Sequence, residues 1–494
     1  MLFIYTILYF ISMMLYYLKQ GIIASVIMVS LAIFLYVAEV RISKRAINVR
    51  GLFALGFIGG FGISLLKLSK LSQEYSMTTF LAVFISYFTL YLGVFFENKS
   101  GNVQKSKKVK LEKSNSVFIS QEILLIVLFI VTFLSFVIEV VLLRFIPLFT
   151  LNTPHAYSTF HVFMIHYITT FYSFIPCFAI CNYFVEPERK QSKVFIVLSF
   201  IYVIIMALLM VSRSQLILSI VLSLFVVIIY KTQSIKKFSF NKKNVMITIS
   251  LVLLFLVLYL VISVNRAHDI EYLNGIFEMK NEKTPIFITQ PYMYIAHNFE
   301  NLNYMIDNIF RFSFGRRILY PFFTLTFVKK FFPIVVDAPY YIIKEELSTV
   351  TMIYDFYYDF GLVGVAVFCF LIGYIGKKLE NKAYSIFDED AAFKNNYILI
   401  LLSLYCYFML FSFFQTYFSL TDTWVYIIAL SLIIVLFNMN KGPNVMSNLN
   451  TSKNTPAKSV KAQDEDVSNT EVNVLDIDEE MQKYSSYYNY EDLK

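Results

Sequence analysis

Long apolar runs recur along most of this chain of 494 residues, and they limit its possible folds more than any other feature. About 20 consecutive apolar residues are enough for an α-helix to cross a bilayer. A soluble domain has about a quarter charged residues, whereas 15% of the residues here are charged and 58% are hydrophobic. Twelve candidate spans cover residues 2–17, 22–40, 51–66, 77–96, 117–145, 158–184, 194–212, 214–230, 245–264, 357–376, 396–415 and 424–438. The sequence therefore predicts an all-α polytopic membrane protein with about twelve transmembrane helices.

The basic residues of the short connections are distributed unevenly between the two sides of these spans. Alternate connections, beginning with residues 41–50, hold 22 Lys and Arg residues in total, and the intervening short connections hold 4. Cytoplasmic connections of membrane proteins carry an excess of Lys and Arg. We therefore expect both termini in the cytoplasm and the long connection between the ninth and tenth spans outside.

The same patterns divide the chain into parts. Residues 1–440 form the expected transmembrane domain, and within it residues 265–350 form one large extracytoplasmic loop. Residues 441–494 hold six Lys and ten Asp or Glu residues. A segment this polar cannot bury enough apolar surface to fold, so it is predicted to be a disordered, acidic cytoplasmic tail.

The large loop contains one stretch with helical periodicity. Apolar residues from Ile295 to Ile309 recur at helical spacing, and amides such as Asn298 and Asn301 fill the other faces. This pattern is typical of an amphipathic helix that lies in the membrane interface. Because the polar face carries amides rather than lysines, the pattern favours a surface that faces sugars over one that binds anionic lipid.

A shorter apolar patch follows in the loop, from Ile318 to Val328. A patch of about eleven residues is too short to span a bilayer, so we expect a re-entrant or interfacial segment. Arg316 and Arg317 precede it, at the depth where a phosphate linked to a lipid would lie. They are interpreted either as anchors for lipid headgroups or as ligands of such a phosphate, since guanidinium groups bind phosphate in bidentate fashion.

Two carboxylates stand where the loop enters the tenth span. Asp355 and Asp359 are four residues apart, so both lie on one helix face, near Tyr354 and Tyr358, if the helix has begun there. Unpaired carboxylates at a membrane boundary are costly. We therefore expect these two to face water, an arginine or a substrate.

Three further polar features lie outside the loop. Arg213 occupies the tight turn between the seventh and eighth spans, where it either anchors a headgroup or binds a ligand that bears phosphate. Glu139 lies in the fifth span and is interpreted as a buried partner of another helix, with a substrate role as the alternative. His155, His161 and His166 surround the start of the sixth span. Their spacing does not stack them on one helix face, so the sequence does not favour a metal site formed by the three.

Several enzyme classes are disfavoured by the sequence. It holds no Walker phosphate loop, no dinucleotide-binding glycine motif and no nucleophile elbow. Its first outer connection, residues 18–21, is too short for the acidic metal-binding motif that some lipid-linked glycosyltransferases carry there. No cofactor, no metal site and no nucleic-acid partner is predicted.

Three motifs carry a resemblance to a known family. One is Ser212-Arg213-Ser214, between two spans in mid-chain. Another is the large outer loop late in the chain, which contains Asn298 to Leu302 and the run Phe314 to Arg317. The third runs from Thr351 to Gly364 and resembles an ending Thr…Phe-Tyr-x-Asp-Phe-Gly-x-x-Gly. Together with the topology of residues 1–440, these motifs resemble the bacterial oligosaccharide repeat-unit polymerases, which make O-antigen and capsular polysaccharide.

The resemblance implies a function and a fold. Such enzymes transfer a growing glycan from undecaprenyl diphosphate to the next lipid-linked repeat unit, at the outer face of the bacterial plasma membrane. The fold implied is related to the GT-C-like glycosyltransferases that use lipid carriers. Implied partners are the undecaprenyl-diphosphate-linked oligosaccharide, membrane lipids, and a flippase, a chain-length regulator or a tyrosine kinase of the same pathway. Tyrosines 484, 487, 488 and 490 in the tail resemble clusters that such kinases phosphorylate, and a plain solvated tail is the alternative.

The resemblance also implies roles for individual residues. A diphosphate leaves readily once its charge is compensated, so arginines are expected to do most of the catalytic work without a metal. The expected diphosphate ligands are Arg213, Arg266, Arg316 and Arg317. The candidate bases for the acceptor hydroxyl are Asp359, Asp355, His268 and His297. The expected sugar-binding residues are Asn298, Glu300 and Tyr358.

Two alternatives remain open from the sequence. A transporter or flippase of lipid-linked sugar would also have many spans, but transporters usually show two related halves, and none is evident here. A glycan ligase or an acyltransferase of the same pathway shares the overall layout. Nothing in the sequence firmly separates transfer to a lipid from transfer to a repeat unit.

Overall fold

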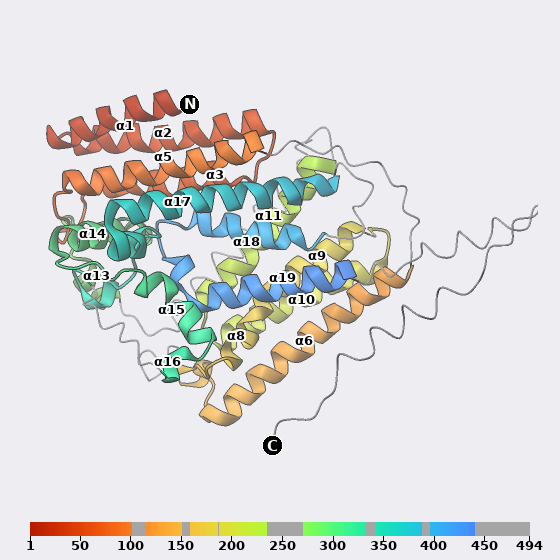
Figure 1. The fold of residues 1–494 in the computed structure, drawn as a ribbon. Helices are drawn as coiled ribbons and strands as arrows, with labels where there is room; N and C mark the ends of the chain where they lie inside the picture. The colour runs from red at the N-terminus through yellow and green to blue at the C-terminus, as the bar shows by residue number, and fades with distance from the viewer. Residues whose placement is uncertain are drawn as a thin grey trace, which may run out of the picture. The chain divides into compact units, whose positions relative to one another are not determined.

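A computed structural model describes residues 1–100, 115–150, 159–185, 187–234, 270–331, 341–387 and 396–439. The chain divides into two units, Met1–Asn440 and Lys441–Lys494. The second unit, for which a disordered tail is predicted, lies outside the described residues, and so does the predicted ninth span at residues 245–264. Within the described part of the first unit, every regular element is helical (Figure 1).

Seven helices in the described residues are long and apolar enough to cross a membrane. They are α2 (Gly21–Ser43), α5 (Met77–Ser100), α6 (Asn115–Leu143), the composite α8–η3–α9, α10 (Lys190–Leu209), α11 (Arg213–Ser234) and α17 (Tyr354–Tyr384). Four shorter apolar helices are α1 (Leu2–Tyr17), the composite α3–η1–α4, α18 (Ile398–Leu410) and α19 (Thr421–Met439). Each coincides with a predicted span, so the prediction of an all-α membrane protein is confirmed for this part of the chain. The total of twelve spans stays a prediction.

Two predicted spans are interrupted helices. The third consists of α3 (Val49–Phe53), the π-helical turn η1 (Ala54–Ile58) and α4 (Gly59–Ser64). A Cβ atom at Gly56, within η1, would lie 2.0 Å from the carbonyl oxygen of Leu410 in α18, so this turn packs directly on another backbone. The sixth consists of α8 (Ile165–Thr170), the 3₁₀ turn η3 (Phe171–Phe174) and α9 (Ile175–Val185). Periodicity alone does not reveal such interruptions, because all these segments are apolar.

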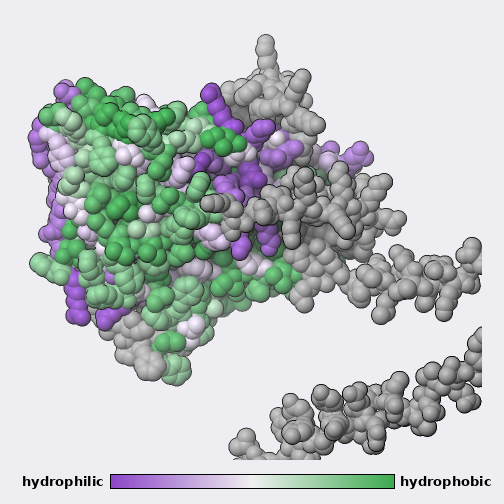
Figure 2. Space-filling view, turned by 45° about the horizontal axis from the view of Figure 1, so that its top comes forward, coloured by the Kyte–Doolittle hydropathy of each residue, from purple (hydrophilic) through white to green (hydrophobic). Residues whose placement is uncertain are grey.

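Apolar side chains cover a broad face of the protein. Figure 2 shows this face as a wide, nearly continuous hydrophobic surface. On α6, for example, Phe133, Leu134 and Val141 are exposed. Soluble proteins rarely expose apolar patches this large. Such a surface is expected of helices that contact lipid acyl chains.

The helices α5 and α17 lie side by side and approach each other unusually closely (Figure 1). A Cβ atom at Gly93 would lie 2.1 Å from the carbonyl oxygen of Phe370, and one at Gly373 would lie 2.3 Å from that of Leu90. Small residues permit this backbone contact between membrane helices. The long helix α17, which begins at the predicted site residue Asp355 and its neighbours, is therefore held by α5 over much of its length.

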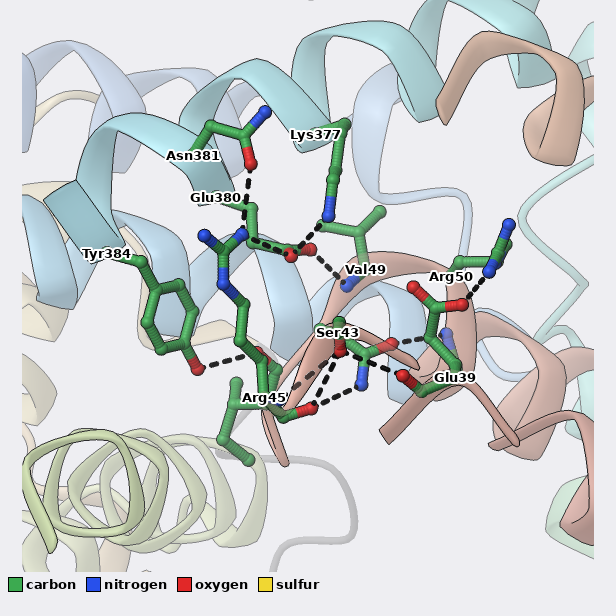
Figure 3. A network of polar contacts seen from close by, with 12 residues as sticks. Glu39, Ser43, Arg45, Val49, Arg50, Lys377, Glu380, Asn381 and Tyr384 are labelled. Carbon is green, nitrogen blue, oxygen red and sulfur yellow. Dashed lines mark hydrogen bonds and ion pairs between the residues drawn. The ribbon is translucent and has the colours of Figure 1, made fainter. Parts of the chain in front are cut away.

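A buried ionic network joins the α2–α3 connection to the end of α17 (Figure 3). Glu380 accepts hydrogen bonds from Arg45 at 2.9 Å, from Lys377 at 2.7 Å and from the Val49 N–H at 3.2 Å. Glu39 forms a second ion pair with Arg50. Two of the four basic residues in the predicted inner connection 41–50 thus bind carboxylates of the protein.

The described part of the large loop contains five short or medium helices. They are α13 (Ile270–Phe277), α14 (Ile286–Asn308), α15 (Arg316–Leu325), α16 (Val328–Phe331) and the 3₁₀ turn η4 (Glu345–Leu347). The loop docks on the connection 67–76, which is predicted on the same side as the loop. The N–H of Lys280 donates to the carbonyl of Leu68 at 2.9 Å, and the N–H of Lys70 donates to the carbonyl of Glu278 at 2.7 Å.

Candidate functional site

Helix α14 forms the core of the loop, and its amides are buried. Asn301 donates hydrogen bonds to the carbonyl oxygens of Leu347 and Thr349 at 2.8 and 2.9 Å. Asn303 accepts a hydrogen bond from the hydroxyl of Thr79, in α5, at 2.7 Å. These amides join the loop to itself and to the membrane helices. The prediction of an interfacial helix with an exposed amide face is therefore wrong, because tertiary packing covers that face.

Glu300 anchors α14 to the connection between α4 and α5. Its carboxylate accepts hydrogen bonds from Lys67 at 2.7 Å, from the hydroxyl of Tyr75 at 3.1 Å and from the Gln73 N–H at 3.0 Å. Burial raises the pKa of Glu300 and lowers the pKa of Lys67 to about 8. With its oxygens bound by the protein, Glu300 is a structural residue, and its assignment to sugar binding is not retained.

His297 and Asn298 also lie in the interior of α14. His297 is 2% exposed, and burial lowers its pKa to about 4. An imidazole this weakly basic and this enclosed is a poor proton acceptor for a substrate hydroxyl. Asn298 is fully buried and donates to the Tyr294 carbonyl one helical turn earlier, at 2.5 Å. Neither side chain is placed to contact a sugar in this structure.

Asp359 caps the first turn of α15. Its carboxylate accepts hydrogen bonds from the N–H groups of Ile318 at 3.0 Å and Arg317 at 3.3 Å, and from the hydroxyl of Ser313. A carboxylate stabilises a helix N-terminus by satisfying its free N–H groups and by its charge. Asp359 can reach this position because α17 leaves helical geometry directly after it, at Phe360 and Gly361.

Asp355 pairs with the second arginine of α15. Arg317 Nε donates to Asp355 Oδ1 at 2.5 Å, and the guanidinium group lies 4.7 Å from the centre of the Tyr358 ring. The structure thus brings Asp355, Tyr358 and Asp359 together with Arg317, as expected for carboxylates that face an arginine. Both carboxylates are bound by the protein, however, which makes them weaker candidates for a base.

The remaining predicted arginines differ in environment. Arg316, the first residue of α15, is exposed. Arg213, the first residue of α11, is 8% exposed. Its turn is tight, since Val211 has a φ of 51° and the Ser212 N–H donates to the Ala207 carbonyl at 2.9 Å. Arg266 and His268 lie outside the described residues.

A polar cavity of about 290 Å³ lies where five elements meet. It is lined by side chains of α8, α11, α15, the turn η6 (Tyr417–Ser419) and α19. The polar lining residues include His166, Gln215, Tyr320, Ser419, Asp422 and Tyr426. Gln215 follows Arg213 by two residues, and Tyr320 lies one helical turn after Arg316 and Arg317. The cavity is thus lined by near sequence neighbours of these arginines, whereas Arg213, Arg316 and Arg317 are not among its lining residues.

Behind the cavity wall, the carboxylate of Glu139 in α6 contacts the imidazole ring of His166. Glu139 Oε1 lies 3.0 Å from His166 Nδ1 and accepts a hydrogen bond from the Val162 N–H at 3.2 Å. Glu139 is fully buried. The interpretation of Glu139 as a buried partner of another helix agrees with this contact, but the sequence did not indicate which helix. The sequence shows the histidine cluster and Glu139 as separate features, and the packing of α6 on α8 brings Glu139 to His166.

Neither a metal cluster nor a disulfide is found in the part of the chain that the structure describes. No three His, Cys, Asp or Glu side chains there are grouped so as to hold a metal ion. The cysteines at positions 177, 181, 369 and 406 are buried free thiols.

The chain matches no family model, no curated protein and no solved structure. Its function is therefore inferred from its residues and their geometry.

Proposed function

We propose that this protein is a membrane glycosyltransferase that polymerises lipid-linked oligosaccharide repeat units into a surface polysaccharide. It transfers the growing glycan from undecaprenyl diphosphate to the next repeat unit, without a metal. The observation that carries the proposal is the polar cavity lined by the loop helix α15, by α8 and α11, and by the segment η6–α19. The short helix α15 begins with two arginines, Arg316 and Arg317, and one turn later its Tyr320 lines the cavity.

The composition of this region suits the two parts of such a substrate. Arginines compensate the charge that develops on a leaving diphosphate, and Arg316 is exposed at the start of α15. Hydroxyl, amide and carboxylate groups recognise sugar hydroxyls, and Gln215, Tyr320 and Asp422 supply all three kinds to the cavity. The exposed apolar helices around the region suit a polyprenyl tail. Arg213, Arg316 and Arg317 remain the proposed diphosphate ligands, with Arg266.

The finer features of the membrane arrangement belong to the same proposal. We place twelve spans in the chain, with residues 245–264 as the ninth, both termini in the cytoplasm of a bacterium, and a fold related to the GT-C-like enzymes. Reporter fusions at positions 102 and 281 test this arrangement, because an alkaline phosphatase fusion is active only outside. Activity at 281 and none at 102 is expected, and the reverse pattern overturns the orientation.

A deletion in the native host tests the function itself. Loss of a polymerase leaves single repeat units on the carrier or the cell surface, and the ladder of polymer lengths on a gel disappears. Expression of the intact chain from a plasmid restores the ladder. An unchanged ladder in the deletion strain contradicts the proposal.

The same experiment separates the alternative functions. Loss of a flippase traps lipid-linked repeat units on the inner leaflet, where they are protected from an externally added glycosidase. Loss of a ligase leaves polymer of normal length on the lipid carrier. Only single repeat units that are accessible from outside agree with a polymerase.

A further inference from the structure

Three of the four residues predicted to accept a proton are bound by the protein or buried, and the fourth, His268, lies outside the described residues. Asp355 pairs with Arg317, and Asp359 caps α15. His297 is buried within α14. A proton acceptor has to lie within hydrogen-bond reach of the substrate hydroxyl, in a space that the substrate can enter. Among the described residues, the polar cavity offers such a space.

His166 meets these requirements better than the predicted residues do. It lines the cavity, and its side chain is 24% exposed, whereas its partner Glu139 is 0% exposed. Because Nδ1 is bound by the Glu139 carboxylate at 3.0 Å, the ring nitrogen that remains for a substrate is Nε2. A carboxylate behind an imidazole fixes its tautomer and stabilises the imidazolium that forms on proton uptake.

Two polar atoms in and behind the cavity wall have unused hydrogen-bonding capacity. Ser419 Oγ and Glu139 Oε2 are buried and have no hydrogen-bond partner among the described residues. Ser419 itself lines the cavity. Buried polar groups are nearly always satisfied by protein, water or ligand. A hydroxyl-rich molecule in the cavity would satisfy the serine.

We propose that His166 is the catalytic base of the glycosyl transfer and that Glu139 is its positioning residue. The inference rests on the proposed function. The oxygen of the acceptor hydroxyl forms a bond to the anomeric carbon of the donor glycan while the bond from that carbon to the diphosphate oxygen breaks. The electron pair of that bond leaves with the undecaprenyl diphosphate, and the hydroxyl proton passes to His166 Nε2. Solvent then removes the proton from the imidazolium ion.

Titratable groups on several elements face His166. Glu139 comes from α6, His161 from the segment before α8, with its ring 4.9 Å from that of His166, and Asp422 from the first turn of α19. Tyr167 and Tyr320 also line the cavity. Two carboxylates and a second imidazole, from different elements, thus lie around the ring of His166.

Purified protein in lipid nanodiscs, supplied with the lipid-linked oligosaccharide extracted from the deletion strain, provides the test. His166→Ala should lower the rate of chain extension by about 100-fold or more, since a general base contributes about 10²–10⁴ to a rate. Added imidazole should restore part of that rate in His166→Ala and leave the wild-type rate unchanged. The rise of the wild-type rate with pH should also be absent from the variant.

Two further variants separate chemistry from folding. Glu139→Gln should lower kcat with little change in KM for the oligosaccharide, and Glu139→Asp should recover part of the loss. Glu345→Gln, the same exchange at an exposed carboxylate that does not line the cavity, should stay within about threefold of wild type. His166→Gln keeps a side chain that can bond Glu139, so it serves if His166→Ala does not fold.

The outcomes distinguish this inference from the proposed function. If the wild-type protein does not extend the oligosaccharide, the proposed function is wrong. If the wild type extends it and both His166 variants do so equally well, the function stands and His166 is not the base. Loss of rate that parallels loss of folded protein, without rescue by imidazole, assigns His166 a structural role and overturns the inference.

Discussion

The carboxylate of Asp359 accepts a hydrogen bond from the N–H of Ile318 at 3.0 Å, across 41 residues of sequence. This contact fixes the start of α15, the helix that carries Arg316 and Arg317 at one end and Tyr320 at the cavity. It accompanies the break in α17 at Gly361, where φ is +61°, a conformation that L side chains rarely adopt, and where a Cβ atom would lie 3.0 Å from the ring of Phe312. The segment from Asp355 to Gly361 thus helps to hold the loop.

Removal of the cap should destabilise the docked loop. Asp359→Ala leaves the Ser313 hydroxyl and two N–H groups of α15 without their acceptor, and loss of a cap costs about 0.5–2 kcal/mol. We expect the thermal midpoint of the detergent-solubilised protein to fall by a few degrees. Glu345→Gln, which changes an exposed carboxylate in the same loop, is the control and should leave the midpoint unchanged. Equal midpoints for wild type and Asp359→Ala contradict the role as a cap.

The two adjacent arginines of α15 should respond differently to substitution. Arg317→Ala leaves the buried Asp355 without its ion partner, which costs about 3–5 kcal/mol for a buried pair. Combining it with Asp355→Asn should recover part of that loss, because no unpaired charge then remains. The free energy of unfolding, measured by chemical denaturation of all three variants, checks this coupling.

Arg316→Ala should instead leave the free energy of unfolding within about 0.5 kcal/mol of wild type, because Arg316 is exposed. If Arg316 binds the diphosphate, the same variant should reduce chain extension at least tenfold, and Arg316→Lys should not restore it fully. Full activity in Arg316→Ala removes this residue from the proposed diphosphate site.

The membrane helices were predictable from the sequence, whereas the contacts of the polar residues were not. An apolar run of sufficient length is a local property, so α2, α5 and α10 coincide with predicted spans. The amide-rich periodicity of α14 was also local, and it predicted a helix correctly. It did not predict burial, because the partners of Asn301 and Asn303 come from residues 347–349 and from α5.

The candidate site shows the same limit. Spacing along one helix predicts that Asp355 and Asp359 share a face and meet water, an arginine or a substrate, and the structure places an arginine there. The pairing of Glu139 with His166 joins two spans, and no local pattern indicates which spans are neighbours. Neither the spacing nor the composition around His166, Tyr320 and Asp422 indicates that these three residues line one cavity.

His297 should make the stability of the protein depend on pH. Burial lowers its pKa from 6.5 to about 4 in the folded state, so between these values the unfolded chain binds a proton that the folded chain does not. Stability therefore falls as the pH falls through this window, by up to about 3 kcal/mol at pH 4 and below. Thermal midpoints between pH 4 and 7 should fall less steeply in His297→Met than in wild type. Parallel curves for the two proteins contradict this role of His297.

The contact between α5 and α17 should be intolerant of a single methyl group at Gly373. The Cβ atom of alanine there would lie 2.3 Å from the carbonyl oxygen of Leu90, and a backbone atom cannot move aside without separating the two helices. Overpacking of this kind costs about 1–3 kcal/mol or more, so Gly373→Ala should lower the thermal midpoint and the yield of monodisperse protein.

The matched control for this exchange is Gly275→Ala in α13, where an added Cβ atom meets nothing within 4 Å. Alanine has a higher helix propensity than glycine, by about 1 kcal/mol, so this variant should be neutral or slightly stabilised. A double variant, Gly373→Ala with Leu90→Ala, sharpens the test. Since the obstacle is the carbonyl oxygen and not the side chain of Leu90, trimming that side chain should bring no recovery. Recovery in the double variant would show that α5 and α17 meet through side chains at this point, and not through their backbones.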